Sequence, residues 1–431
     1  MKTVTVIGAG LAGCEAAYQL AKRGVEVELV EMRPERKTPA HETGNFAELV
    51  CSNSLRGNHL NQAVGVLKAE MRLLDSLIMQ AAEHAKVPAG SALAVDRAMF
   101  SSFIEEKLTA MPNVKIIRRV QSEIPKTPAI IATGPLTDGE LLETLEKRFG
   151  EALHFYDAAA PIIRADSINY DVCYKKSRYD KGTADYINCP MDKETYLKFH
   201  DALINAKCTN IKDFEMNVFE GCMPVETMAS RGVDTLLFGP LKPVGLTPDN
   251  GEKPHAVVQL RQDDIRGSML NMVGFQTHLT FPEQKRIIRM IPGLENAVIL
   301  RYGVMHRNSY IKAPNHLNAT YALKEDPFLA IAGQLSGVEG YVESAASGLV
   351  AAIMLAHNLS NNPIKPFPLE TVIGAQADYI AHADANHFQP MNANFGLLPA
   401  LEKRVPKKFR KEKYAERALD ALKVYIEEVK P

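Results

Sequence analysis

The sequence predicts an α/β fold in which a discontinuous Rossmann-like nucleotide-binding domain carries an inserted α+β domain. A β-branched strand runs into a glycine-rich turn at residues 4–13, and a second apolar strand ends in glycine at residues 328–333. The residues between these two segments show a different sequence pattern, which is typical of short strands and frequent turns. We therefore predict a first part of the nucleotide-binding domain at 1–160, an inserted substrate domain at 161–320, and a second part at 321–431 that ends in a basic helical tail.

The N-terminal segment reads as a βαβ unit. Residues 3–8 form a β-branched strand, and residues 11–23 have the apolar spacing of a helix that ends at Gly24. Residues 25–31 form the second strand. A parallel pair of strands joined by a helix follows from this order.

The turn inside this unit has the glycine spacing of a dinucleotide site. Gly8 permits the tight turn, Gly10 permits close approach to a pyrophosphate, and Gly13 permits helix–strand packing. The helix N-terminus then faces the phosphates, and Glu31 ends the second strand where an acid accepts hydrogen bonds from a ribose. The cofactor-binding residues predicted here are Gly8, Ala9, Gly10, Leu11, Ala12, Gly13 and Glu31.

The remaining elements of the nucleotide-binding domain follow from periodicity and turn residues. A polar loop is expected at 32–60, and a loop of this length in a compact domain is typical of a functional segment. We predict helices at 61–86, 97–110 (with Asp96 as N-cap) and 138–148, and strands at 92–95, 128–134 and 328–333.

The composition of the chain excludes some classes of function. The 431 residues suffice for two or three domains, and the net charge of −1 gives no global attraction to nucleic acid. None of the six cysteines has CxxC or zinc-ligand spacing, so we expect no metal. No secretory signal and no apolar run of membrane-spanning length is expected, which favours a cytoplasmic protein with reduced thiols.

FAD and NAD both fit the opening motif, and two later segments favour FAD. The turn at Thr133-Gly134 and the segment from Gly333 to Tyr341 resemble flavoproteins that have a second glycine turn and a C-terminal strand and helix closing over the flavin. We add Thr133, Gly134, Gly333 and Tyr341 to the predicted cofactor-binding residues. The alternative is that 328–350 is only a core strand and helix with small residues.

These motifs together resemble the tRNA-modifying flavoproteins, and further motifs resemble one branch, the folate- and FAD-dependent tRNA uracil-5-methyltransferases. The matches span nearly the whole chain in the expected order. They comprise residues 32–34, 38–41, 51–54, 87–90, 93–97, 238–245, 273–276, 290–295, 302–308 and 388–391.

The resemblance implies a reaction and its residues. The family's two functional cysteines correspond to Cys51 and Cys222, and its flavin-facing tyrosine to Tyr341. Cys222 would add to C6 of a uridine in the T-loop of tRNA, which makes C5 nucleophilic. The one-carbon unit would come from methylenetetrahydrofolate and be reduced to methyl by FAD, which NAD(P)H re-reduces. Cys51 would act near the flavin, in proton transfer or as a protecting thiol.

Without the resemblance, we would interpret Cys222 as a small buried hydrophobic residue, which is the usual role of a free cysteine. Cys14, Cys173, Cys189 and Cys208 are predicted to be structural. A reactive thiol needs a nearby cation or helix N-terminus, and Arg56 and Arg97 are the candidate cations.

Candidates for binding folate and RNA are basic side chains. His306 and Arg307 are candidates for folate contacts, with His278 and Asn308 in neighbouring motifs; exposed strand residues are an equal alternative. A basic tail could bind phosphates and stack bases, or form a solvated helix face. Its residues are Lys403, Arg404, Lys407, Lys408, Arg410, Lys411, Lys413 and Arg417, with Phe409 and Tyr414 between them. A second patch could comprise Arg286, Arg289, Arg301 and Arg307.

Three functions remain open from the sequence. The first is the RNA methyltransferase, with tRNA or ribosomal RNA as its substrate. The second is an NAD(P)H–flavin oxidoreductase for a small molecule, although the missing CxxC argues against a dithiol reductase. The third is a tRNA-wobble-modification flavoprotein, a family with a longer chain.

Overall fold

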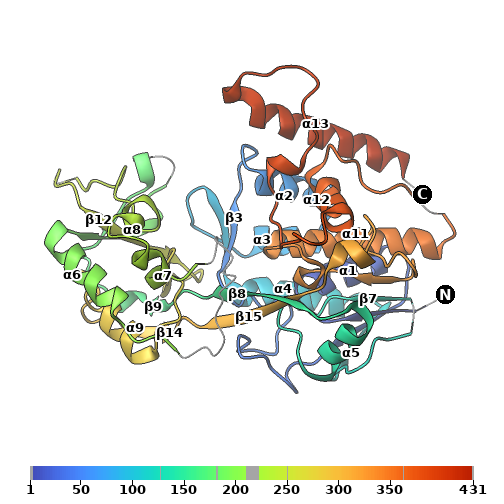
Figure 1. Cartoon of the computed structure of the whole chain (residues 1–431), viewed down its shortest axis with the longest axis horizontal. Coiled ribbons are helices and arrows are strands. Elements are labelled where there is room, and N and C mark those ends of the chain that lie inside the picture. The colour runs from blue at the N-terminus through green and yellow to red at the C-terminus, as the bar shows by residue number, and fades with distance from the viewer. Residues whose placement is uncertain are drawn as a thin grey trace.

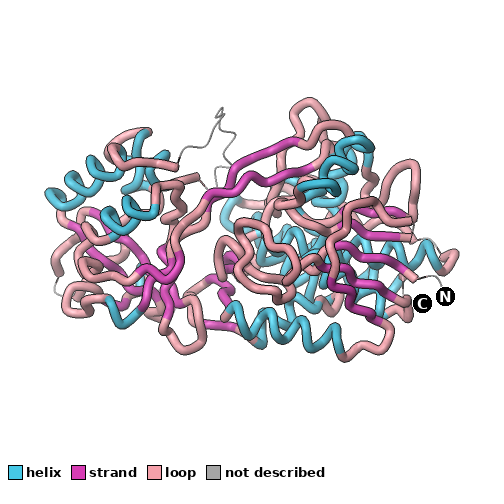
Figure 2. Tube along the Cα trace, turned by 90° about the horizontal axis from the view of Figure 1, so that it is seen from below, coloured by secondary structure: helices cyan, strands magenta, loops and turns pink. Residues whose placement is uncertain are grey.

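The protein folds into two lobes of unequal size (Figure 1). In the computed structural model the described residues are 3–429, except 127, 181–182, 210–222, 250 and 363. The large lobe contains residues 3–158 and 305–429, and the small lobe contains residues 162–301. Each lobe has its own hydrophobic core, and each holds strands of its own in the orthogonal view (Figure 2).

A five-stranded parallel sheet lies at the centre of the large lobe. Its order is β16–β7–β1–β2–β6. The strands are β1 (Val4–Ile7), β2 (Val27–Glu31), β6 (Val114–Arg118), β7 (Ala129–Ile131) and β16 (Leu329–Ile331). The last strand of the sheet comes from the far end of the chain and pairs with β7. The discontinuous Rossmann-like domain predicted from the sequence is thereby confirmed.

Two helices that follow glycine turns pack closely on each other. They are α1 (Leu11–Lys22) after β1 and α11 (Tyr341–Leu359) after β16. A Cβ atom on Gly348 of α11 would collide with the Ala12 backbone of α1. Glycine is therefore required at this helix crossing by packing alone, and the two ends of the nucleotide-binding domain are joined there.

The other helices of the large lobe surround these two and a small antiparallel sheet of order β3–β5–β4. The small sheet comprises β3 (Ser54–Gly57), β4 (Lys86–Val87) and β5 (Ala92–Val95). The helices are α2 (Ala63–Leu73), α3 (Leu77–His84), α4 (Arg97–Thr109), α5 (Gly139–Phe149), α10 (Ala313–His316), α12 (Val372–His382) and α13 (Lys407–Glu428).

Most of the elements predicted for the large lobe are present in the structure, and two of the predictions are wrong. Asp96 caps α4 through its side chain, as predicted. The helix predicted at 61–86 is two helices, because Asp75 has a positive φ of 55° and Ser76 caps a new helix. The predicted loop at 32–60 contains the strand β3, which pairs with β5.

The small lobe is built on a six-stranded antiparallel sheet of order β10–β11–β12–β13–β9–β14. The strands are β9 (Ile162–Arg164), β10 (Tyr174–Lys175), β11 (Tyr186–Met191), β12 (Ala256–Gln262), β13 (Met269–Met272) and β14 (Ile299–Arg301). The helices are α6 (Lys193–Ile204), α7 (Val225–Ser230), α8 (Thr235–Phe238) and α9 (Phe281–Ile288). This is the α+β insertion predicted from the sequence.

Two paired strands connect the lobes. The strand β8 (Leu153–Ala158) leads out of the large lobe, and β15 (Met305–Tyr310) returns antiparallel to it. Tyr310 and Leu317 already belong to the core of the large lobe, whereas the small core ends near Ile299. The return to the large lobe therefore comes earlier than the predicted boundary at residue 320, because β15 crosses back beside β8.

The helix α11 is long and apolar enough to cross a membrane by length and composition. However, 78% of its apolar window is buried inside the protein, where it packs on α1. It is the core helix of the large lobe.

Candidate active site

Two adjoining cavities lie at the carboxyl ends of the parallel strands, where ligands of open α/β sheets bind. The outer cavity is lined by Gly8, Glu31, Arg33 and Thr137 among others. The inner cavity is lined by Leu11, Ala12, Cys51, Gly134, Asp157, His306, Asn308, Gly333, Tyr341 and others. Gly10, His41, Thr133 and Leu136 line both. The two cavities therefore form one elongated site.

The three glycines of the opening turn are required for different reasons. A Cβ on Gly8 would meet the backbone of Ala132, and one on Gly13 would collide with the carbonyl oxygen of Gly8. No protein atom lies within 4 Å of the position that a Cβ on Gly10 would take. Gly10 also has a φ of −78°, which any residue adopts. Its missing side chain leaves free space at the junction of the two cavities.

Glu31 lies buried at the outer cavity with both carboxylate oxygens engaged. One oxygen accepts the Ala9 N–H at 2.7 Å, and the other accepts the Arg33 side chain at 2.8 Å. Burial alone would raise the pKa of Glu31, but the hydrogen bonds and charge of Arg33 outweigh it and hold the pKa below its usual value. The ionised carboxylate keeps lone pairs that can accept ribose hydroxyls.

The glycine segment that begins at Gly333 lies at the same site, although it comes from the C-terminal part of the chain. The Ala332 N–H donates to the Ile131 carbonyl at 2.9 Å, and the Gly333 N–H donates to the Ser347 hydroxyl at 2.7 Å. Thr133, Gly134 and Gly333 all line the inner cavity. All sequence-predicted cofactor residues except Ala9 and Gly13 line one of the two cavities. The Ala9 N–H donates to Glu31, and Gly13 packs against the Gly8 carbonyl.

The loop at residues 51–54, here called the cysteine loop, is held by the first residue of α11. The Tyr341 hydroxyl accepts the N–H groups of Cys51 at 2.7 Å and of Ser52 at 3.2 Å. Burial raises the pKa of Tyr341 well above its ordinary value, so this hydroxyl stays protonated. The Cys51 Sγ lies 3.6 Å from the Ala158 carbonyl, at the end of β8.

The small lobe secures the other side of the cysteine loop. The Arg261 guanidinium donates to the Ser52 hydroxyl at 2.9 Å and to the Asn53 side-chain oxygen at 2.9 Å. The Asn53 amide in turn donates to the carbonyls of Val95 and Gln262, each at 3.0 Å. The loop is therefore fixed by both lobes at once.

Of the two candidate cations for the thiol, Arg97 is the one near Cys51. Arg97 pairs with Asp263 of the small lobe at 3.0 Å, donates to the Leu49 carbonyl, and interacts electrostatically with Cys51. Burial would lower the pKa of Arg97, but the Asp263 carboxylate outweighs it and raises that pKa. Arg56 instead pairs with the buried Glu343.

The strand β15 divides the folate candidates between two faces. His306 and Asn308 are buried and line the inner cavity, whereas Arg307 is exposed. The His306 Nε2 is buried and has no hydrogen-bond partner among the described residues. Burial, with the charges of Arg301 and His41, lowers the pKa of His306 to about 4. A neutral imidazole therefore presents a polar atom to the cavity.

The arginines of the second predicted patch do not form one free surface. Arg301 is tied to Glu42 at 3.1 Å and to the Ala40 carbonyl of the large lobe. Arg289 donates to the Ala297 carbonyl, and Arg286 pairs with Glu283. Three of the four arginines are thus engaged within the protein.

Cys222 lies outside the described residues, but both flanks of its segment are anchored. Thr209 N donates to the His278 carbonyl at 2.9 Å, and Val225 N donates to the Gln276 carbonyl at 2.7 Å. Thr277 N in turn contacts the Ala159 carbonyl at 3.4 Å, next to the end of β8. The flanks therefore converge on the segment 276–278, which contacts Ala159, next to the Ala158 carbonyl on which the Cys51 sulfur lies.

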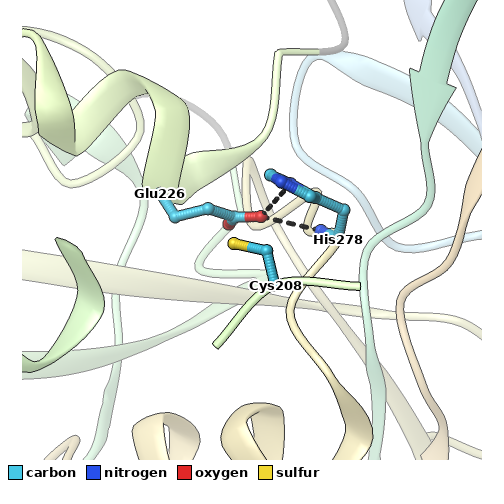
Figure 3. A group of neighbouring side chains, drawn as sticks. All are labelled: Cys208, Glu226 and His278. Carbon is cyan, nitrogen blue, oxygen red and sulfur yellow. Dashed lines mark hydrogen bonds and ion pairs between the residues drawn. The ribbon is translucent and has the colours of Figure 1, made fainter. Parts of the chain in front are cut away.

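Cys208, Glu226 and His278 gather beside these flanks (Figure 3). Their ligand-type atoms lie within 4.8 Å of one another. The Glu226 carboxylate is already bonded to His278 Nδ1 at 2.5 Å, to the His278 N–H at 2.7 Å and to the Thr277 hydroxyl at 3.0 Å. Hydrogen bonds within the protein account for this cluster.

Several residues of the site were not predicted as site residues from the sequence. Asp157 and His41 reach the cavities from a linker strand and a long loop, and Arg261 reaches the cysteine loop from near the end of β12 in the other lobe. His41 lies in a motif that matches the family, which was the available signal. Asp157 and Arg261 follow only from tertiary packing.

The residues present fit a flavin dinucleotide. The empty space beside Gly10 suits a pyrophosphate at the start of α1. Glu31 suits a ribose, and the unpartnered His306 Nε2 offers a hydrogen bond in the inner cavity.

We expect Gly10→Ala to weaken FAD binding at least about tenfold, or ~1.4 kcal/mol, because the added methyl occupies the space a phosphate would take. The free energy of unfolding of the apoprotein should change by less than about 1 kcal/mol, since no protein atom meets the methyl. Flavin titration and chemical denaturation measure the two effects. The control Gly13→Ala should lose stability itself, and equal FAD affinity of Gly10→Ala and wild type would contradict the assignment.

We expect His306 to make the protein acid-sensitive between pH 6.5 and 4. In this range the unfolded chain protonates His306 and the folded chain does not, so the free energy of unfolding falls as pH falls. The loss from pH 7 to pH 4.5 should be about 2 kcal/mol smaller in His306→Gln, measured by chemical denaturation. The exposed His59→Gln should behave as wild type, and the same decline in all three proteins would refute the buried neutral state.

Comparison with known proteins identifies a matching family and a solved structure with the same fold. The family described as "Glucose inhibited division protein A" matches residues 3–363. The structure of GidA from Aquifex aeolicus (form II crystal) shares the fold, with a TM-score of 0.68 at 16% identity, over 98% of this chain and 73% of that chain.

Two proteins named methylenetetrahydrofolate--tRNA-(uracil-5-)-methyltransferase TrmFO are much more similar. The protein from Anoxybacillus flavithermus is 58% identical over 99% of this chain and 100% of its own. The protein from Staphylococcus carnosus is 59% identical over 99% of this chain and 98% of its own. The chain therefore belongs to the glucose-inhibited division protein A family and, within it, to the methylenetetrahydrofolate--tRNA-(uracil-5-)-methyltransferase TrmFO family.

Proposed function

We propose that this protein methylates C5 of the T-loop uridine of tRNA, with methylenetetrahydrofolate as the one-carbon donor and FAD, reduced by NAD(P)H, as the reductant. The observation that carries the proposal is the cysteine loop, which both lobes hold against the inner cavity beside Tyr341. The names of the 58–59% identical relatives support the same substrates.

Cys222 is the proposed nucleophile. Its thiolate would add to C6 of the uracil, since the resulting enolate makes C5 reactive toward the one-carbon unit. The proposal is supported by the anchored flanks of residues 210–222, which converge on the segment 276–278 next to Ala159. That segment adjoins the end of β8, whose Ala158 carbonyl contacts the Cys51 Sγ.

The chain's own residues prepare the inner cavity for this chemistry. When bound, FAD supplies the electrons that reduce the transferred methylene to methyl. Tyr341 fixes the backbone of Cys51, and Arg97 places a buried positive charge near its sulfur. The Cys51 thiol would move a proton at the cavity wall. His306 and Asn308, which line the same cavity, offer polar atoms for a heterocycle.

The basic N-terminal turns of α13 are the proposed RNA contact. Residues 407–413 are all exposed, and α13 begins to bury side chains only at Ala415. The helix begins away from the body of the large lobe (Figure 1). Lys413 pairs with Glu416, and Arg417 donates to the Pro399 and Ala400 carbonyls, so these two are engaged within the protein. The segment of α13 available for phosphates comprises Lys407, Lys408, Arg410 and Lys411, with Phe409 exposed for stacking.

We expect Cys222→Ala to abolish formation of 5-methyluridine while FAD remains bound, because the nucleophile is removed and the dinucleotide site is not touched. Purified protein is incubated with methylenetetrahydrofolate, NADH and unmodified tRNA, and the nucleosides are analysed by mass spectrometry. Cys208→Ala, a half-buried cysteine of the same lobe, is the matched control and should keep its activity.

Methylation by Cys222→Ala would exclude this cysteine as nucleophile. A parallel incubation with ribosomal RNA tests the substrate, since methylation of ribosomal RNA alone would overturn the tRNA assignment. NADH oxidation that continues without any RNA product from the wild type would favour a small-molecule oxidoreductase.

We expect charge reversal at Lys407, Lys408 and Arg410 to weaken tRNA binding and to lower the salt dependence of binding by about two to three in log–log slope, because each phosphate contact releases about one counterion. Filter binding over a salt series measures both, and NADH oxidation should stay unchanged. Lys423→Glu near the other end of α13 is the matched control. A slope equal to that of wild type would show that these turns are only a solvated helix face.

A further inference from the structure

We propose that Cys173 and Cys189 form a redox-sensitive thiol pair, which oxidants of the peroxide class convert to a reversible disulfide inside the small lobe. Both cysteines lie outside the candidate active site. The proposed reaction on uridine requires neither of them, so the pair is a separate modification site.

The register of the sheet places the two cysteines opposite each other. In the antiparallel pair of β10 and β11, Tyr174 faces Asn188. The next position along the ladder therefore sets Cys173 against Cys189. Directly opposite residues of antiparallel strands have Cα atoms about 4.5–5.5 Å apart, which lies within the range of about 4.4–6.8 Å that a disulfide requires.

The two cysteine side chains lie close together, as expected from the register of the strands. The Cys173 Sγ lies 3.3 Å from the Cys189 Sγ, and both residues are buried. The Cys173 sulfur is confined on its other side by Gly293, where a Cβ would collide with it, and it lies 3.8 Å from the Pro292 carbonyl. Neither sulfur must travel far to form a bond.

A small oxidant can approach this pair from the surface. Cys173 lines an open cleft together with Tyr170, Tyr174 and Met191. One thiolate attacks the peroxide O–O bond, which yields a sulfenic acid and hydroxide. The second thiol attacks the sulfenic sulfur and releases water. In total, two thiols and one hydrogen peroxide give one disulfide and two waters, and a small thiol reverses the reaction by exchange.

The reaction is slow at neutral pH. The hydrogen bond with Cys173, together with burial, raises the pKa of Cys189 well above its ordinary value. Little Cys189 thiolate is present at pH 7, so oxidation that begins at this sulfur should accelerate as pH rises. Such a pair responds to sustained peroxide and stays reduced otherwise.

The hairpin that the disulfide would lock reaches the large lobe. Beyond the cysteines, the Asp185 carboxylate accepts the Gly90 N–H at 2.7 Å, and the Tyr186 hydroxyl donates to the Ala89 carbonyl at 3.2 Å. A covalent link at Cys173 and Cys189 would restrain the base of the segment that makes this contact. Oxidation should therefore stabilise the small lobe against unfolding.

To test the proposal, the reduced full-length protein is oxidised with hydrogen peroxide at pH 8.5. Its free thiols are then blocked with N-ethylmaleimide in denaturant, and its tryptic peptides are mapped without reduction. Trypsin can cleave between the two cysteines, at Lys175 and Arg178, so a disulfide appears as two linked peptides that dithiothreitol separates. The thermal midpoint of unfolding should rise by about 2–4 °C. Cys208→Ala should give the same link and the same rise.

Recovery of both cysteines as N-ethylmaleimide adducts while Cys51 is oxidised would overturn the proposal, as would a link from Cys173 to another cysteine. Cys189→Ala should lose the rise in thermal midpoint, and Cys173→Ser serves if that variant does not fold. The peptide map of wild type decides the question without any variant.

Discussion

The Tyr341 hydroxyl, which accepts the N–H groups of Cys51 and Ser52, is the interaction on which the site depends. It joins residues 290 positions apart, so it exists only when β16 has paired with β7 and α11 has packed on α1. Without it, these two part-buried backbone donors would lose their hydrogen-bond acceptor. The dinucleotide site and the position of the Cys51 thiol are therefore set by one folding event.

The second constraint is the polar contact between the lobes. Arg261 bonds the cysteine loop, and Asp263, two residues further along the chain, pairs with Arg97. Both side chains of the ion pair are nearly buried, where an unpaired charge would be costly. The small lobe therefore has one favourable orientation on the large lobe at this point. Arg301 of the small lobe adds a second polar contact, because it is bonded to Glu42 and to the Ala40 carbonyl of the large lobe.

The sequence predicted what local pattern and turn chemistry determine. The strand, glycine turn and acid of residues 4–31 were sufficient for the dinucleotide site, since each residue acts through its own backbone geometry. The break at Asp75 was missed, because a continuous apolar face runs through it and positive φ in aspartate has no periodic signal. Asp157 and Arg261 could not be predicted, since they enter the site through sheet pairing between distant segments. The role of Cys222 came only from family resemblance.

Three residues that line the inner cavity, His306, Asn308 and Tyr341, present neutral hydrogen-bonding groups. The pKa of His306 is about 4, so the imidazole is neutral near pH 7, and its buried Nε2 lacks a partner among the described residues. Tyr341 is protonated and already engaged as an acceptor, and Asn308 is neutral. The walls at these positions thus present neutral hydrogen-bonding atoms, which suit the edges of a flavin or pteridine. The Arg97 guanidinium is held beside the cysteine loop by its ion pair with Asp263 and by the Leu49 carbonyl. The neutral groups of the cavity wall and the ion pair beside the cysteine loop are therefore separate parts of the site.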